Sequence, residues 1–384
     1  MERIYFDNAA TTWPKPTVVY EAVDHFNRNI GGNPGRGSNA STLAAGSLLT
    51  EAREALARLF NIHDSSQIAF TPNVTAALNI ALKGLLSPGD HVITTSMEHN
   101  SVARPLTALT RQGVEWTMAP CGADGSLDPD EVRRAIRRNT KMIVMLQVSN
   151  LTGTVMPVRE AGAIAREHEI YMVVDSAQSA GVLPIDVQAD NIDVLCFTGH
   201  KGLLGLQGTG GIYLSPNIVP AAMTEGGTGS LSEALEHPDF MPDHLEAGTH
   251  NTPGICGLLA GVNFILETGV ETIGRHEREL AALIMDGVTQ IPGVKLYGPG
   301  DIERRTAVLP LQMEGIECGE LSLALEYEYG ILSRSGLHCA PLAHRTLGTL
   351  EQGLCRFSPG YFNTREQALM LLKALDEIRR KMAR

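Results

Sequence analysis

Lys201 stands in a setting that suits chemistry. It lies in CFTGHKGL (196–203), where the apolar segment VLCF runs into a polar turn and the lysine sits between His200 and Gly202. Lysine amines normally lie in water. Lys201 is therefore either a surface side chain in a loop or an amine that the protein uses, and this stretch alone does not decide between the two.

Asp175 and Gln178 extend the pattern. Asp175 ends the apolar run YMVVD, Gln178 follows three residues later, and Lys201 comes 26 residues after the aspartate. A buried carboxylate needs a cation or a hydrogen-bond donor, although Asp175 could also cap the segment that follows it. An aspartate that keeps a pyridine nitrogen protonated and a lysine that forms a Schiff base are what pyridoxal phosphate requires.

Cys339 is the third reactive residue, in the loop sequence RSGLHCAPL (334–342). A free cysteine is usually an inert buried thiol. Here Arg334, His338 and His344 flank it, and positive charge on these side chains would favour the reactive thiolate. Both interpretations remain open on these residues alone.

The elements that must position these residues alternate along the first part of the chain. Helical apolar spacing over 42–60 and 73–86 is interleaved with short apolar runs typical of strands. These runs lie at 67–71, 91–96, 114–120, 141–149, 171–176, 194–199 and 210–215. Short apolar strands between helices predict a mainly parallel sheet covered on both faces. Polar residues follow several of the runs, at the edge where such sheets bind ligands.

The sequence after about residue 262 has a different texture. A long helical stretch covers 263–288, and short strands near 294–298, 306–313, 330–336 and 354–360 precede a final helix. We therefore expect a large domain over 18–262 and a smaller α/β domain formed by 1–17 and 263–384, which carries the cysteine loop. Since no low-complexity linker separates them, we expect the two domains to be packed together.

Composition restricts the partners and the compartment. The formal net charge of −12, without any basic run, argues against nucleic acid or an anionic membrane as partner. No stretch reaches the roughly 18 apolar residues of a membrane span, and MERIYFDNAATTWPKP has no signal-peptide core. We expect a cytoplasmic protein. The six cysteines include no C-x-x-C pair, so neither a metal site nor a disulfide framework is indicated.

Seven motifs together resemble one family. The chain is similar to the fold-type I pyridoxal-phosphate enzymes of the class V aminotransferase superfamily, and within it to the cysteine desulfurases and selenocysteine lyases. The motifs occur in the family's order: DNAATT (7–12), MEHN (97–100), VSNLTGT (148–154), VDSAQSAG (174–181), TGHK (198–201), EAGTHNT (246–252) and RSGLHCAPLAH (334–344). The resemblance spans nearly the whole chain and implies an α/β architecture with pyridoxal 5'-phosphate as cofactor.

The resemblance also implies roles for individual residues at the cofactor. Lys201 would carry the cofactor as a Schiff base, a task that suits a desolvated amine of lowered pKa. Asp175 would pair with the pyridine nitrogen and Gln178 would face the phenolic oxygen. His99 would stack on the ring and help to move protons. The implied phosphate ligands are Thr75, Thr198, His200 and, from a second subunit of a homodimer, Thr249.

The substrate side follows from the same resemblance. Cys339 would attack the sulfur of L-cysteine, leaving alanine and an enzyme persulfide that passes to a sulfur-acceptor protein in iron-sulfur cluster assembly. Arg356 would clamp the substrate carboxylate, with Asn150 beside it and Arg334 as a further substrate-binding residue. From the residues alone, Arg356 could equally be a partner in a surface ion pair. The short cysteine loop resembles group II enzymes, which often act on selenocysteine.

Two segments depart from the family pattern, and the alternatives remain open. Residues 35–39 read GRGSN where many group II enzymes have a histidine-rich segment, and 73–75 read NVT in place of glycine and two threonines. The first departure weakens inference about substrate access, and the second leaves Thr75 as the threonine ligand of that turn. A selenocysteine lyase would share every residue named. An aminotransferase or β-lyase would not need Cys339, and a non-catalytic sulfur-assembly scaffold would need neither Cys339 nor Lys201.

Overall fold

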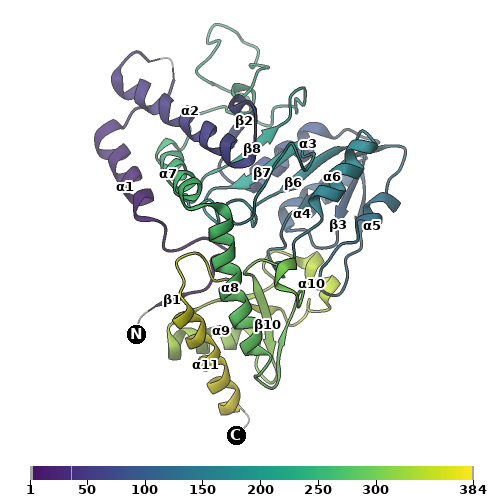
Figure 1. The fold of residues 1–384 in the computed structure, drawn as a ribbon. Coiled ribbons are helices and arrows are strands. Elements are labelled where there is room, and N and C mark those ends of the chain that lie inside the picture. The colour runs from purple at the N-terminus through teal and green to yellow at the C-terminus, as the bar shows by residue number, and fades with distance from the viewer. Residues whose placement is uncertain (1–2, 36, 383–384) are drawn as a thin grey trace.

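A seven-stranded sheet forms the centre of the larger part of the chain (Figure 1). The computed structural model describes residues 3–35 and 37–382. In spatial order the strands are β2 (Ile68–Thr71), β8 (Gly210–Leu214), β7 (Val194–Thr198), β6 (Tyr171–Asp175), β5 (Thr140–Leu146), β3 (His91–Thr95) and β4 (Glu115–Ala119). The strands from β7 to β4 pair in parallel, and β8 runs antiparallel to both its neighbours. The expected mainly parallel seven-stranded sheet is confirmed.

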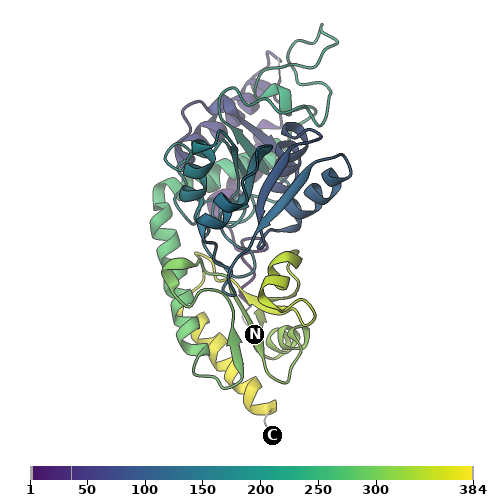
Figure 2. The same ribbon diagram turned by 90° about the vertical axis from the view of Figure 1, so that its right-hand side faces the viewer.

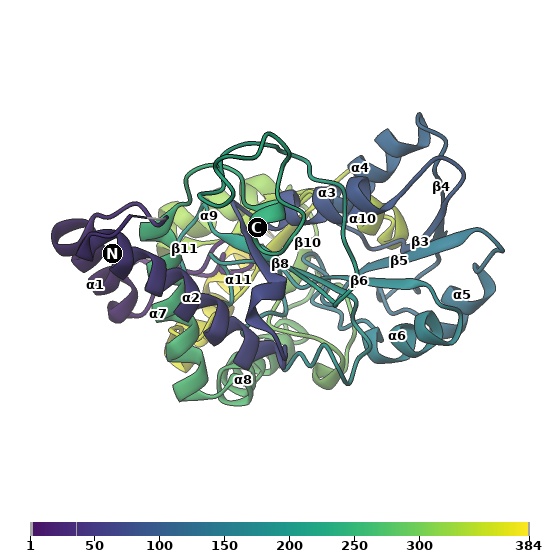
Figure 3. The ribbon, with the colours of Figure 1, turned by 90° about the horizontal axis from the view of Figure 1, so that it is seen from above.

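Helices cover both faces of this sheet, as the view from above shows (Figure 3). Along β6, Val173 faces a core that contains residues of α3 (Val74–Leu85) and α4 (Asn100–Thr110). Met172 and Val174 face the opposite core. The second core includes residues of α2 (Ala40–Phe60), α5 (Pro129–Arg134), α6 (Val158–Glu167) and α7 (Thr252–Thr268). Burial on both faces explains why the strands are continuous apolar runs.

A smaller sheet of order β12-β13-β10-β9 lies beyond one end of the large one (Figure 2). Its strands are β9 (Val294–Leu296), β10 (Leu309–Met313), β12 (Arg334–Gly336) and β13 (Leu354–Phe357), and its helices are α8 (Val270–Val288), α9 (Cys318–Tyr329) and α11 (Arg365–Met382). The N-terminal strand β1 (Ile4–Tyr5) joins this part by pairing with β11 (Ile331–Leu332). Two further helices are α1 (Thr17–His25) and α10 (Pro341–Leu347).

The hydrophobic cores divide inside α8. Ile273 belongs to the core of the large sheet, whereas Leu280 and the following buried residues belong to the core of the small one. We therefore place the domain boundary within α8 rather than at residues 262 and 263, which lie in α7. The expected single helical stretch over 263–288 is interrupted at Gly269, whose φ of 89° only glycine adopts readily.

The described residues contain neither a single membrane-spanning helix nor a cluster of metal-ligating side chains. No single helix is both long and apolar enough to cross a membrane, and only the bent pair α7 and α8, at 84° to each other, meets the length and composition test. No group of three or more histidine, cysteine, aspartate or glutamate side chains in this part of the chain could hold a metal ion.

Candidate active site

Asp175 and Lys201 meet at the carboxyl edge of the large sheet. Asp175 is the last residue of β6, β6 and β7 are parallel neighbours, and Lys201 comes three residues after the end of β7. Both side chains line one small cavity, together with His99, Asn150 and Gln178. The topology therefore brings together five of the residues that the sequence singled out.

Burial shapes the electrostatics of the pair. It lowers the pKa of Lys201 to about 8, and the nearby carboxylate of Asp175 opposes this shift. It also raises the pKa of Asp175, against the stabilising effects of the Ala177 N–H and of Lys201. The Lys201 amine makes no hydrogen bond to any of the described residues. A lysine that is easily deprotonated and a buried acid that can act as a donor or an acceptor thus share one cavity.

His99 is held in one orientation and one protonation state. It is the N-cap of α4, and its Nδ1 accepts a hydrogen bond of 3.0 Å from the Ser101 N–H. This bond assigns the ring proton to Nε2. Burial, followed by the charges of Lys201 and two arginines, lowers the pKa of His99 to about 4. His99 is therefore a neutral imidazole with an Nε2–H donor at neutral pH.

Gln178 and Asn150 are tied to other parts of the chain. Gln178 donates from Nε2 to the carbonyl of Ala9 at 2.8 Å. Asn150 donates from Nδ2 to the carbonyl of His338 at 2.8 Å, and its buried Oδ1 has no partner in the described part of the chain. Asn150 is thus available to a ligand through its acceptor, while its donor holds the loop that contains Cys339.

None of the four expected phosphate ligands is among the residues that line this cavity. Thr75 is exposed in the first turn of α3, which Asn73 caps through the Ala76 N–H at 3.0 Å. Thr198 is buried at the end of β7, and His200 keeps Nδ1 buried without a partner while burial lowers its pKa to about 4. Thr249 is exposed and lines a different cavity. It therefore contributes nothing to the cavity of its own chain.

Arg356 is deeply buried beside the cavity. It lies in β13, is 2% exposed, and donates from Nη1 to the Asn150 carbonyl at 2.8 Å and from Nη2 to Asp7 Oδ1 at 2.9 Å. Its Nε has no hydrogen-bond partner among the described residues. Arg334, paired in register with Arg356, is half exposed and donates from Nε to the other oxygen of Asp7 at 3.1 Å. Arg356 is thus not the surface ion-pair partner that the sequence left open.

The cysteine loop is held in a backbone conformation of high energy. His338 and Cys339 both adopt left-handed φ angles, 52° and 55°, and each such residue costs roughly 1–3 kcal/mol. The Asn150 side chain binds the His338 carbonyl, and the Asn100 N–H binds the Cys339 carbonyl at 2.9 Å. The side chain of Cys339 is exposed. The surrounding structure therefore presents this thiol to solvent next to residues that line the cavity.

The expectation that His338 and His344 supply positive charge to Cys339 is wrong. Burial lowers the pKa of both imidazoles, to about 3 for His338. The two rings are stacked with centroids 5.9 Å apart, and His344 Nδ1 bonds to Thr349. Both are neutral at pH 7, so Arg334 is the only one of the three flanking residues that carries charge.

The N-terminal motif contributes residues to which the sequence assigned no role. Thr11 and Thr12 donate to the carbonyls of His200 and Lys201 at 3.1 and 2.9 Å, and Lys15 donates to the His200 carbonyl at 3.2 Å. Asp7 pairs with two arginines as described above. The motif DNAATT carried part of the resemblance, and this was the signal that could have marked these residues as part of the site.

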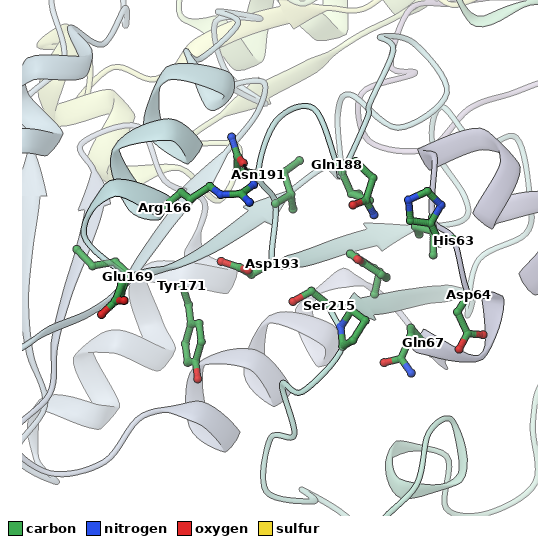
Figure 4. Close-up of a pocket in the computed structure, with 16 residues that line it drawn as sticks. His63, Asp64, Gln67, Arg166, Glu169, Tyr171, Gln188, Asn191, Asp193 and Ser215 are labelled. Carbon is green, nitrogen blue, oxygen red and sulfur yellow. Dashed lines mark hydrogen bonds between the residues drawn. The ribbon is translucent and has the colours of Figure 1, made fainter.

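A second cavity lies at the opposite end of the same strands (Figure 4). Tyr171, the first residue of β6, and Asp193, just before β7, both line it, which places it about 17 Å from the Lys201 edge for a five-residue strand. Arg166 donates to Asn191 at 2.6 Å, and Asp193 accepts from the Met172 N–H. This cavity is remote from the chemistry described above.

The residues at the carboxyl edge fit pyridoxal phosphate. Asp175 offers a buried carboxyl group for a pyridine nitrogen, and Lys201 offers an unbonded amine for a Schiff base. The first turn of α3 presents N–H groups, which favour a phosphate. The unpartnered Nδ1 of His200 is a further polar atom for such a group.

The chain belongs to the aminotransferase class-V family, since its residues 4–371 match the family model of that description. Enzymes of this family depend on pyridoxal phosphate, which the site fits. A curated relative from Methanothermobacter thermautotrophicus, described as a probable cysteine desulfurase, is 33% identical over 98% of this chain and 95% of its own length. The cysteine desulfurase of Pectobacterium atrosepticum is 31% identical over 98% and 93%.

Solved structures agree with this assignment. A cysteine desulfurase from Thermococcus onnurineus NA1 superposes with a TM-score of 0.90 at 29% identity, covering 99% of this chain and 95% of the other. The cysteine desulfurase CsdA of Escherichia coli gives a TM-score of 0.86 at 28% identity, with coverage of 97% and 94%. The expected fold-type I architecture is therefore confirmed.

Proposed function

We propose that this chain is a pyridoxal-phosphate-dependent cysteine desulfurase that converts L-cysteine to L-alanine and takes up the sulfur on Cys339. The observation that carries the proposal is the placement of an exposed thiol in a loop that Asn150 and Asn100 hold against the cavity of Lys201 and Asp175. An aminotransferase needs the lysine and the aspartate but has no use for this thiol. The similarity to enzymes named cysteine desulfurase supports the same reaction.

Arg356 and Asn150 would bind the substrate carboxylate. The unpartnered Nε of Arg356 is a buried donor, and an arginine fork matches a carboxylate in shape and charge. Two of its other donors are already used by Asn150 and Asp7, which fix the plane of the guanidinium. The substrate is thereby oriented from a rigid group, which lowers the entropic cost of reaching the reactive geometry.

Lys201 and His99 would move the protons. The bound cofactor supplies an electron sink for the bond-breaking steps. Lys201, with a pKa near 8, can take a proton at Nζ from the substrate carbon and return it, because both protonation states are accessible near neutral pH. His99 donates from Nε2 and cannot compete for the proton, since its pKa is about 4.

Cys339 would perform the sulfur transfer. Its thiolate attacks the substrate thiol sulfur, so that a sulfur–sulfur bond forms while the bond between that sulfur and the substrate β-carbon breaks. The electron pair of the broken bond stays with the carbon fragment, which takes up a proton to become L-alanine. The products are alanine and a Cys339 persulfide. A thiol of an acceptor protein then takes over the outer sulfur as a new persulfide, or two equivalents of a small-molecule thiol reduce the persulfide to sulfide and become a disulfide.

Three further features complete the proposal. Thr249 is exposed and does not line the cavity of Lys201 in its own chain. This position suits a role at the cofactor phosphate of a neighbouring subunit in a homodimer. A sulfur-acceptor protein, with iron-sulfur cluster assembly as the destination, would consume the persulfide. Six free cysteines suit a reducing compartment, so we place the enzyme in the cytoplasm.

A substrate panel tests the function. The cofactor-loaded protein is given L-cysteine, L-selenocysteine, L-cystine and a set of amino acids with a keto acid, and the products are quantified. L-Cysteine should yield alanine and sulfide in equal amounts when a reducing thiol is present. Pyruvate and ammonia from L-cysteine would instead indicate β-elimination, and new amino acids would indicate transamination.

A pair of cysteine variants sharpens the test. Cys339→Ser should lower L-cysteine turnover by about three orders of magnitude or more, because the covalent nucleophile is lost, while L-selenocysteine cleavage survives in part. Cys318→Ser removes a partly exposed thiol on α9 and should leave turnover unchanged. Equal effects of the two substitutions would rule out Cys339 as the sulfur acceptor.

A further inference from the structure

The carboxylate of Asp7 bridges two arginines, and one of them, Arg356, bonds to Asn150, which lines the cavity. Its Oδ1 accepts from Arg356 Nη2 at 2.9 Å, and its Oδ2 accepts from Arg334 Nε at 3.1 Å. Asp7 is 13% exposed, so water screens the bridge only partly. Asp7 comes directly after Phe6, a fully buried residue of the small-domain core, and its backbone forms a bridge with Ser358. The carboxylate is thus anchored at a fixed place.

The two arginines would repel each other without this carboxylate. They are partners in register on the adjacent strands β12 and β13, and each lies within electrostatic range of the other, since Arg334 lowers the pKa of Arg356. With Asp7 between them, the three side chains carry a net charge of one positive unit. A single carboxylate of a bound amino acid then makes the site neutral.

The two guanidinium groups are not equally available. Arg356 is 2% exposed and keeps an unpartnered Nε, so it has a buried donor to offer to a ligand. Arg334 is 51% exposed, and its one hydrogen bond among the described residues goes from Nε to Asp7. Asp7 therefore holds Nε of Arg334, and its negative charge offsets the positive charge that would attract a second carboxylate on the substrate.

We propose that Asp7 is the specificity-determining residue that confines the site to amino acids with one carboxylate, by neutralising Arg334 while it positions Arg356. The proposal rests on the proposed function only for the place of the substrate carboxylate at Arg356. Without the charge of Asp7, Arg334 is free to bind the side-chain carboxylate of a dicarboxylic amino acid. When Asp7 is charged, the side-chain carboxylate of such a ligand meets the negative charge of Asp7 beside Arg334.

Equilibrium binding tests this without any turnover. Cofactor-loaded protein is titrated with L-alanine and with L-aspartate, and the change in cofactor absorbance gives a dissociation constant for each. The parent should prefer L-alanine. In Asp7→Asn, which keeps the shape but removes the charge, the affinity for L-aspartate relative to L-alanine should rise at least about 10-fold, the scale of one charge-assisted hydrogen bond to a carboxylate.

Three further variants separate the charge effect from a structural one. Asp7→Glu restores the charge and should return the affinity ratio toward the parent value. Adding Arg334→Gln to Asp7→Asn should abolish the gain, because the second carboxylate loses its partner. Asp24→Asn removes an exposed carboxylate on α1 that pairs with Arg28, and should change nothing.

Turnover of L-cysteine gives an independent readout. The kcat of Asp7→Asn should fall, because Arg356 loses the charged acceptor that fixes the plane of its guanidinium, and Asp7→Glu should restore it in part. An affinity ratio that stays within about twofold of the parent would overturn the proposal, as would a gain that persists in the double variant. Other results would overturn the proposed function instead of the role of Asp7. In that case the parent protein would lack cofactor absorbance, or would bind L-alanine but not turn over L-cysteine.

Discussion

The lowered pKa of Lys201 predicts how fast the cofactor attaches at each pH. Only the neutral amine reacts with an aldehyde. With a pKa of about 8 instead of 10.5, about 10% of Lys201 is neutral at pH 7, against about 0.03% for an ordinary lysine. The shift corresponds to about 3 kcal/mol of destabilisation of the charged amine, which arises mainly from burial.

The assay measures the rate at which the cofactor-free protein takes up pyridoxal phosphate between pH 6 and pH 10. Each rate is divided by that of Nα-acetyl-lysine under the same conditions, which cancels the titration of pyridoxal phosphate itself. The absolute rate for the protein should rise about fivefold from pH 7 to pH 8 and only about twofold beyond pH 8, because the neutral fraction saturates above the pKa. The ratio of the rate for the protein to the rate for Nα-acetyl-lysine should be largest at low pH.

Lys15 provides the control, because burial lowers its pKa to about 8 as well. Lys15→Met should keep the pH midpoint of cofactor uptake, whereas Lys201→Met should abolish covalent uptake. Borohydride reduction followed by peptide mapping should place the cofactor on Lys201. A rate that keeps rising tenfold per pH unit up to pH 10 would refute the lowered pKa, and label on Lys15 would refute the assignment of the Schiff-base lysine.

Three other predictions concern stability, the cysteine loop and assembly. Glu98 is fully buried, and its pKa is raised from 4.5 to about 8, so ionisation of this carboxyl disfavours the folded state. The melting temperature of Glu98→Gln minus that of the parent should therefore increase as pH rises from 4.5 to 8. A difference that stays constant over this range would contradict the prediction. Asn150→Ala removes the buried bond to His338 and should lower L-cysteine turnover about 10- to 100-fold with cofactor content retained; loss of cofactor instead would point to a different role. The active form should sediment as a dimer, and an active monomer would exclude a shared site at Thr249.

Much of the large domain could be predicted because its signals are local. The apolar runs that end at Asp175 and Thr198 do form neighbouring parallel strands, and this places Lys201 beside Asp175. The antiparallel direction of β8 was not predicted, since its apolar composition is the same in either direction. The break between α7 and α8 rests on the φ of Gly269, and an isolated glycine within a helical pattern does not by itself specify a break.

The electrostatics of the site could not be predicted in the same way. His338 and His344 lie near Cys339 in sequence, but their charge depends on burial, which neutralises them. The bridge from Asp7 to Arg334 and Arg356 joins residues more than 300 positions apart, which the pairing of β1 with β11 brings together. Such contacts depend on tertiary packing and leave no periodic signal in the sequence.

Sulfur transfer to Cys339 is the central claim, and one single-turnover measurement tests it directly. Cofactor-loaded protein is mixed with one equivalent of L-cysteine without any reducing thiol, quenched, alkylated, and analysed by peptide mass spectrometry while free alanine is quantified. We predict one alanine per active site and a mass increase of one sulfur atom on the peptide that contains Cys339. Alanine formed with the extra sulfur on another cysteine, or sulfide released at once with Cys339 unmodified, would contradict the mechanism.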